Sequence, residues 1–122
     1  MGRVKTDLLE VSEDIGDRVL VLAQALDRKR VYSRIVSQLV GCGTSVGANL
    51  FEADEAMSTK DWLKSVGVAL KELNETRYWL RRIGKQNWVK PQQLADLQDT
   101  CDNLRRVLGT MARKTKARNS SM

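Results

Sequence analysis

Apolar residues recur at three- and four-residue steps through four successive segments of the chain, which is the spacing of one face of an α-helix. The third segment is the most regular, because its steps alternate between four and three without interruption. Its apolar-face residues are Trp62, Val66, Ala69, Leu73, Thr76, Leu80 and Ile83. Ser58 precedes this segment as a predicted N-cap, with Asp61 three residues later in a capping-box position. The pattern predicts a helix over residues 59–84.

The other three segments follow the same rule and predict helices over residues 5–26, 30–56 and 91–115. The run from Asp27 to Arg30 supplies the first turn, and Gly84 and Pro91 bracket the last one. Four helices joined by short turns are typical of an all-α, antiparallel up-down-up-down four-helix bundle. We therefore expect residues 1–122 to form a single domain, with a basic, frayed tail over residues 116–122.

One stretch departs from the amphipathic pattern. Residues 35–51 carry no charge, although the chain is 30% charged. The stretch is too polar and too rich in glycine to span a membrane, so we expect a helix surrounded by protein on most of its circumference. Each glycine in a helix costs roughly 1 kcal/mol relative to alanine, so a close approach by another backbone is expected. That approach is either internal to the bundle or at an oligomer interface formed by Gly41, Gly43, Ser45 and Gly47.

The composition excludes several kinds of chemistry. The chain has no histidine, which removes the commonest general base and the commonest metal ligand. Cys42 and Cys101 lie within apolar helical patterns and are expected to be buried thiols. The N-terminal residues lack the apolar core of a signal peptide, so we expect a cytoplasmic protein. Nothing in the composition indicates a cofactor.

Two Glu-x-x-Glu pairs, Glu52/Glu55 and Glu72/Glu75, invite comparison with all-α pyrophosphohydrolases, in which carboxylates on two helices hold magnesium. In the predicted hairpin, Glu72 lies about nine residues beyond the point opposite Glu52, or roughly 14 Å at 1.5 Å per residue. Carboxylates that far apart do not share a metal ion. We therefore expect no enzyme activity, no catalytic residues and no metal site.

The positive charges are concentrated in two windows, residues 28–34 and 77–90, which contain no acid. In an antiparallel bundle the start of the second helix and the end of the third lie at the same end. Cations interleaved with tyrosine and tryptophan bind phosphates and stack exposed bases, so the sequence predicts binding of RNA or DNA. Alternatively, the cations compensate helix dipoles and the rings simply pack. The predicted nucleic-acid-binding residues are Arg28, Lys29, Arg30, Arg34, Arg77, Arg81, Arg82, Lys85 and Lys90.

A family resemblance covers about residues 30–83. It rests on two helix segments and a middle acid, at Gln38, Ser45, Val46, Asn49, Glu52, Ser58, Asp61, Leu63 and Glu72 or Glu75. With these residues the chain resembles the 23S rRNA-intervening-sequence proteins, a family that also includes the accessory variability determinants of diversity-generating retroelements. Ala53 follows Glu52 where the family usually has glycine, which indicates a divergent branch.

The resemblance implies a small bacterial four-helix bundle that assembles as a homopentameric ring and has no catalytic residues. Most members have no assigned activity, whereas the retroelement members bind nucleic acid and a reverse transcriptase. Two functions are therefore expected. The first is a homo-oligomeric, nucleic-acid-binding accessory factor, with a reverse transcriptase as a further partner. The alternative is a protein–protein scaffold without specific nucleic-acid binding. Neither involves a membrane.

Overall fold

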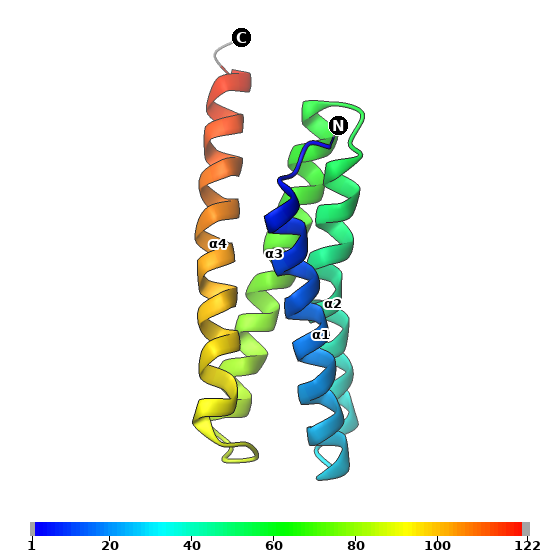
Figure 1. The fold of residues 1–122 in the computed structure, drawn as a ribbon, viewed down its shortest axis with the longest axis vertical. Helices are drawn as coiled ribbons and strands as arrows, with labels where there is room; N and C mark the ends of the chain where they lie inside the picture. Colours follow the sequence, from blue (N-terminus) through cyan, green and yellow to red (C-terminus); the bar gives the residue numbers. More distant parts are fainter. Residues whose placement is uncertain (1, 121–122) are drawn as a thin grey trace.

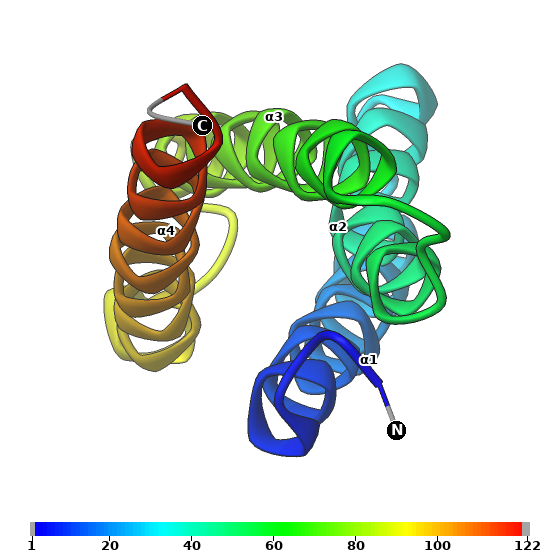
Figure 2. The same ribbon diagram turned by 90° about the horizontal axis from the view of Figure 1, so that it is seen from above.

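The computed structural model describes residues 2–120, which form four helices and no strand. The helices are α1 (Thr6–Arg28), α2 (Ser33–Asp54), α3 (Thr59–Gly84) and α4 (Pro91–Ser120). They run alternately up and down (Figure 1), which confirms the predicted all-α class and the four helices. Among the helix pairs that are in contact, packing is most extensive between α2 and α3 and least extensive between α1 and α4. Seen from above, α3 joins α2 to α4, and α1 stands across from α4 (Figure 2).

The core is built from the apolar face of each helix. Every residue of the predicted α3 face is buried, from Trp62 to Ile83. Ile15, Leu39 and Leu108 are fully buried on the other three helices, so all four contribute to one core. The predicted cap of α3 is also present, because the Ser58 hydroxyl oxygen accepts a hydrogen bond of 3.1 Å from the backbone N–H of Asp61.

The turn after α1 explains why α2 begins at Ser33 rather than at residue 30. Arg30 has a φ of 57°, a left-handed conformation that usually falls to glycine at the end of a helix. The backbone N–H of Val31 donates to the Leu26 carbonyl oxygen at 3.1 Å, and that of Arg30 donates to the Asp27 carbonyl oxygen at 2.9 Å. These two bonds form a Schellman motif, which ends α1 before the chain reverses.

Two of the four small residues of α2 pack inside the chain. A Cβ atom added to Gly43 would lie 2.7 Å from a Val19 methyl carbon, and one added to Gly47 would lie 3.5 Å from the Ser12 backbone. On α1, a Cβ atom at Gly16 would meet the Gly43 carbonyl oxygen at 3.7 Å. Gly43 and Gly47 therefore allow α1 to approach α2 closely. Only the other two residues of the predicted oligomer interface face outward.

The outward pair is Gly41 and Ser45. A Cβ atom at Gly41 would meet nothing within 4 Å, and the half-buried Ser45 side chain donates to the Gly41 carbonyl oxygen at 2.6 Å. Thr44, Ala48 and Phe51 are exposed as well. The expectation that α2 is surrounded on most of its circumference is therefore wrong for the single chain, because α2 packs only against α1 and α3.

The fourth helix is longer than predicted. It continues to Ser120, so the expectation of a frayed tail is wrong for residues 116–120. Lys116, Ala117 and Arg118 are good helix formers, and cations are favoured near a helix C-terminus. Residues 121 and 122 of the predicted tail lie outside the described residues. None of the helices in residues 2–120 is both long and apolar enough to cross a bilayer.

Candidate nucleic-acid interface

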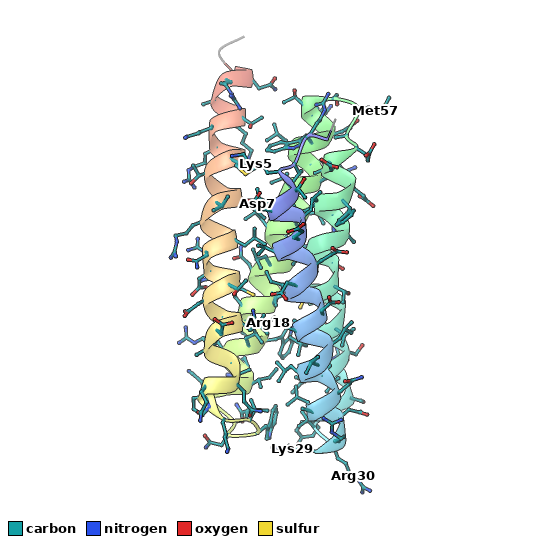
Figure 3. The ribbon with its side chains drawn as sticks, viewed as in Figure 1. Lys5, Asp7, Arg18, Lys29, Arg30 and Met57 are labelled. Carbon is teal, nitrogen blue, oxygen red and sulfur yellow. The ribbon has the colours of Figure 1, made fainter. Side chains whose placement is uncertain are left out.

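The two predicted basic windows meet at one end of the bundle, which we call the basic pole. It comprises the α1–α2 turn, the start of α2, the last two turns of α3 and the α3–α4 loop. Lys29 and Arg30 lie at this end in Figure 3, opposite Met57, and Arg30 points away from the helices. The Lys29 ammonium group donates a hydrogen bond to the Trp88 carbonyl oxygen. This contact joins the α1–α2 turn to the α3–α4 loop directly.

Most of the predicted cations remain accessible. Arg77 is half-buried and the other eight are exposed; these are Arg28, Lys29, Arg30, Arg34, Arg81, Arg82, Lys85 and Lys90. Three ion pairs occur within residues 2–120, and only one of them, between Arg77 and Asp102, involves a predicted cation. The structure therefore brings the nine residues to one pole but leaves them in different electrostatic environments.

Arg77 faces the acids of α4. Its Nε atom lies 2.7 Å from the Asp102 carboxylate, and its Nη1 atom donates to the Asn74 side-chain oxygen at 3.1 Å. Both arginines of this side, Arg77 and Arg81, line a polar hollow of about 320 Å³ together with Gln98, Asp99 and Asp102. Because two carboxylates share this hollow, it is a poor phosphate site. Sequence reasoning missed these acids, since they lie outside both basic windows.

The side of α3 that faces α2 is different. A hollow of about 330 Å³, which we call the aromatic hollow, opens between the start of α2, the end of α3 and the loop before α4. Its lining contains no acid and consists of Tyr32, Ile35, Tyr78, Trp79, Arg82, Ile83, Gln86 and Trp88. The aromatic residues predicted to accompany the cations therefore converge on a single concave surface.

The rings of the aromatic hollow differ in exposure. Tyr32 and Tyr78 are 73% and 54% exposed, whereas Trp79 and Trp88 are half-buried and pack against the core. The Tyr78 and Trp79 rings form an edge-to-face pair with centroids 5.1 Å apart and an interplanar angle of 75°. Two tryptophans thus pack against the core, as the alternative interpretation expects, while two tyrosines remain open to a ligand.

Helix dipoles alone do not explain the charge at this pole. The C-termini of α1 and α3 lie there and favour cations, but the N-termini of α2 and α4 lie there too and favour anions. The first turn of α2 contains no acid, and its N-cap residue Tyr32 makes no side-chain capping bond. Arg34 in that turn stands next to positive backbone charge. Its placement runs against dipole compensation and favours an anionic partner.

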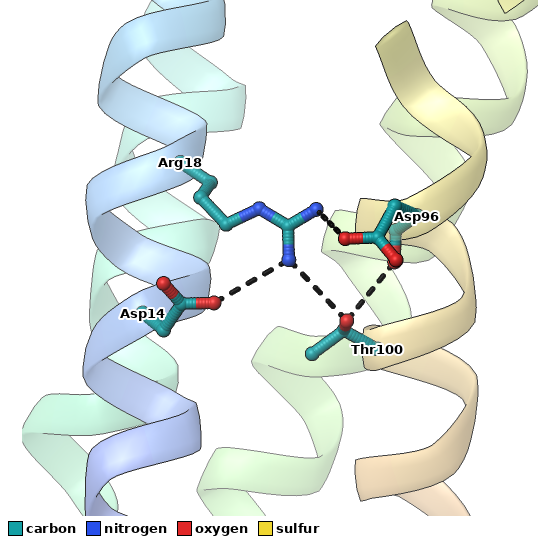
Figure 4. A network of polar contacts seen from close by, with 4 residues as sticks. All are labelled: Asp14, Arg18, Asp96 and Thr100. Carbon is teal, nitrogen blue, oxygen red and sulfur yellow. Dashed lines mark hydrogen bonds and ion pairs between the residues drawn. The ribbon is translucent and has the colours of Figure 1, made fainter. Parts of the chain in front are cut away.

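A second polar network, not foreseen from the sequence, joins α1 to α4. Arg18 contacts the Asp96 carboxylate at 2.7 Å and the Asp14 carboxylate at 3.4 Å, and it donates to the Thr100 hydroxyl oxygen at 3.3 Å (Figure 4). This network spans the least extensively packed pair of helices. The i,i+4 spacing of Asp14 and Arg18 was its only signal in the sequence. Asp96 is therefore ion-paired with Arg18, and it is not among the residues that line the aromatic hollow.

The thiols offer no reactive group. Cys42 and Cys101 are both free and buried. Burial raises the pKa of the Cys42 thiol and raises the pKa of Cys101 to about 12, so both stay protonated and weakly nucleophilic near neutral pH. Within residues 2–120, no three acidic, cysteine or histidine side chains gather in a way that could hold a metal ion.

Comparison with known proteins identifies the family. Residues 5–110 match the family described as 23S rRNA-intervening sequence protein, which extends the resemblance into both outer helices. A crystal structure of a protein of unknown function from the S23 ribosomal protein family of Bacteroides thetaiotaomicron is similar, with a TM-score of 0.81 and 26% sequence identity over 86% of this chain and 97% of that one. No protein with a curated description matches the chain. The chain belongs to the 23S rRNA-intervening sequence protein family.

Proposed function

We propose that this protein is a non-enzymatic, nucleic-acid-binding accessory factor and that the basic pole is its binding surface. The observation that carries the proposal is the grouping of exposed cations around an acid-free aromatic hollow. Arg82 lines that hollow, and Arg34 lies in the first turn of α2 beside it. The net charge of +6 supports attraction of a polyanion over longer distances.

Phosphate contacts at this pole have a measurable signature. Each cation that neutralises a phosphate releases condensed counterions, so affinity falls with rising salt. For single strands, the logarithm of the binding constant falls by about 0.7 per phosphate contact for each tenfold rise in salt concentration. A surface with several accessible cations therefore predicts a steep salt dependence.

The test is a titration of fluorescently labelled single-stranded RNA between about 50 and 200 mM salt, followed by anisotropy. We expect tight binding at low salt that weakens steeply. The double substitution Arg34→Glu/Arg82→Glu should lower affinity strongly and reduce the salt slope by about 1.4, which corresponds to two lost phosphate contacts. Both side chains are exposed, so the fold should be retained.

The matched control is Lys60→Glu/Lys64→Glu, which makes the same change in net charge near the start of α3, at the opposite pole. Both lysines are exposed. We expect this control to bind RNA nearly as well as the unaltered protein. Equal losses in the two double variants would mean that net charge alone drives binding, and absence of binding at low salt would overturn the proposed function.

A second candidate function, a self-associating scaffold, is favoured by a different surface. A groove of about 310 Å³ runs between α1 and α2 and includes the apolar side chains Leu20 and Phe51, which are 43% and 46% exposed. The uncharged outer face of α2, with Gly41 and Ser45, adjoins it. A second copy of the chain covering these surfaces would bury apolar area that one chain leaves in water.

Light scattering tests this assembly. On the family resemblance we propose a ring of five, whose mass would be five times the 13.8 kDa of the chain. Phe51→Lys should dissociate the assembly if the α1–α2 groove is the contact, and Ser45→Lys should do so if the outer face of α2 is. A monomeric unaltered protein would exclude the scaffold. The retroelement role adds a reverse transcriptase as a proposed partner, testable by co-purification.

A further inference from the structure

The aromatic hollow has the shape and composition of a binding site rather than of a packing defect. Its volume of about 330 Å³ is at the lower end of the range of roughly 300 to 1,000 Å³ found for small-molecule sites. Four aromatic rings and two isoleucines line it, together with the polar groups of Gln86 and Arg82. A cavity of this kind suits a flat, partly polar ring better than a flexible aliphatic chain.

The rings are held in place before any ligand arrives. Trp79 is packed against the core and meets the Tyr78 ring edge to face. Trp88 is also packed against the core, and its backbone carbonyl oxygen accepts a hydrogen bond from Lys29. Ordering flexible side chains is a cost of binding that a preorganised surface avoids. Tyr78 therefore offers a stacking surface whose position is set by its contact with Trp79, and Tyr32 adds an exposed ring at the same hollow.

We propose that the aromatic hollow takes up one unstacked base of a single-stranded nucleic acid, while the surrounding cations hold the adjacent phosphates. The inference rests on the proposed function and adds the class of ligand. In a duplex the bases are paired and stacked, so their faces are not available to an aromatic side chain. In a single strand, stacking on aromatic rings is available to every base, because each base has a π-face. The pole should therefore prefer single strands to duplexes.

Charge complementarity favours a base over an apolar side chain of a partner protein. Arg28, Arg30, Arg34, Lys85 and Lys90 are all exposed at the same pole. The aromatic hollow is lined by Arg82 and by no acid. A polyanion that threads its backbone past these cations would bring a base to the mouth of the hollow, whereas an apolar peptide would gain nothing from them.

The experiment removes rings without removing charge. Tyr32→Ala and Tyr78→Ala are compared with the unaltered protein for binding of a single-stranded RNA and of a duplex of the same length at the same salt. We expect each substitution that removes a stacked ring to weaken single-strand binding by about five- to a hundredfold, with duplex binding unchanged within about twofold. The salt slope should not change, because no cation is lost.

Two controls accompany these variants. Met57→Ala removes an exposed apolar side chain at the opposite pole and should leave single-strand binding unchanged. Tyr32→Phe and Tyr78→Phe keep the ring and should bind like the unaltered protein. A strand with the same phosphates but with abasic sugars provides the reciprocal test. It should bind the unaltered protein as weakly as the normal strand binds the alanine variants.

The outcomes separate the two proposals. If the alanine variants bind single strands normally, or if the abasic strand binds as tightly as the normal one, the base-binding inference is overturned, and a salt-dependent phosphate interaction still supports the proposed function. The same result is expected if the hollow instead holds an apolar side chain of a partner protein. Absence of any binding at low salt overturns both proposals. If an alanine variant fails to fold, the abasic strand decides the question without it.

Discussion

Two sides of the same helix end differ in what they offer to an anion. On the side of α3 that faces α4, Arg77 and Arg81 share a hollow with Asp99 and Asp102. On the side that faces α2, Arg82, the residue after Arg81, shares a hollow with aromatic rings and with no acid. In the sequence, these three arginines look equivalent, because they all lie near the C-terminal end of α3. The neighbouring helix determines whether acids share the hollow with an arginine, and Arg77 is ion-paired with one of them.

The difference shows that a count of cations is a poor guide to an anion site. An arginine that is paired within the chain must break that pair before it can hold a phosphate, so its contribution to binding is small. An exposed arginine beside uncharged rings has only to release water and mobile ions when it binds a phosphate. The two hollows of α3 therefore provide a direct internal comparison, which the following substitutions can sharpen or break.

The largest effect is expected when the acids on the α4 side are neutralised. Asp99→Asn/Asp102→Asn should free Arg77 from its ion pair and remove the two carboxylates from the hollow that Arg81 lines. With both arginines then open to phosphates, the salt slope for single strands should steepen by about 1.4 and low-salt affinity should rise by about tenfold. The measurement is the same anisotropy titration over a range of salt. The control Glu52→Gln/Glu55→Gln removes two exposed acids at the opposite pole. An equal gain in that control would show that net charge, not the α4 hollow, is responsible.

A smaller effect is expected at Arg30, which belongs to the basic pole but sits in a strained conformation. Its φ of 57° favours glycine over a residue with a Cβ atom by about 1 kcal/mol. Arg30→Gly should therefore raise the free energy of unfolding by about that amount, measured by urea denaturation, while it weakens RNA binding slightly.

Arg30→Ala separates the two contributions. It removes the charge, but alanine still has a Cβ atom, so the strain at this φ remains. The variant should therefore weaken binding in the same way without stabilising the fold. If Arg30→Gly leaves stability unchanged, the backbone at this turn is not strained. If neither variant weakens binding, Arg30 lies outside the phosphate path.

The smallest effects are expected from a matched pair on α3, Arg82→Gln and Arg77→Gln. Arg82→Gln should reduce the salt slope by about 0.7 and leave stability unchanged. Arg77→Gln should lower the free energy of unfolding by about 0.5 kcal/mol, the worth of a partly exposed ion pair, and leave RNA affinity unchanged. Anisotropy and urea denaturation on both variants check the pair. The comparison would be contradicted if Arg77→Gln reduced the salt slope and Arg82→Gln lowered the free energy of unfolding.

The features that followed from the sequence are those that depend on a single helix or on chain order. The alternating steps from Trp62 to Ile83 predicted the buried face of α3, and Ser58 predicted its cap. The meeting of the two basic windows at one pole followed from antiparallel order alone. These predictions succeed because helical periodicity and chain direction are local properties.

The features that could not be predicted from the sequence depend on how one helix is rotated against another. Spacing alone does not distinguish Gly43, which touches Val19, from Gly41, which faces open space. Nor does it reveal that Asp102 reaches Arg77, because 25 residues separate them and Asp102 lies on α4, outside both basic windows. The finding that Arg77 alone of the nine cations is ion-paired, within the described residues, therefore required the structure.

The most direct test of the central claim uses the three tryptophans as reporters. Trp79 and Trp88 line the aromatic hollow, whereas Trp62 lies at the opposite pole, where its indole N–H donates to the Arg3 carbonyl oxygen. The protein is labelled with fluorotryptophan and titrated with single-stranded RNA while the fluorine resonances, assigned by single Trp→Phe substitutions, are recorded. We predict that the Trp79 and Trp88 resonances shift as binding saturates and that the Trp62 resonance stays in place. Saturable binding that shifts Trp62 and leaves Trp79 and Trp88 unchanged would contradict the assignment of the basic pole as the nucleic-acid interface.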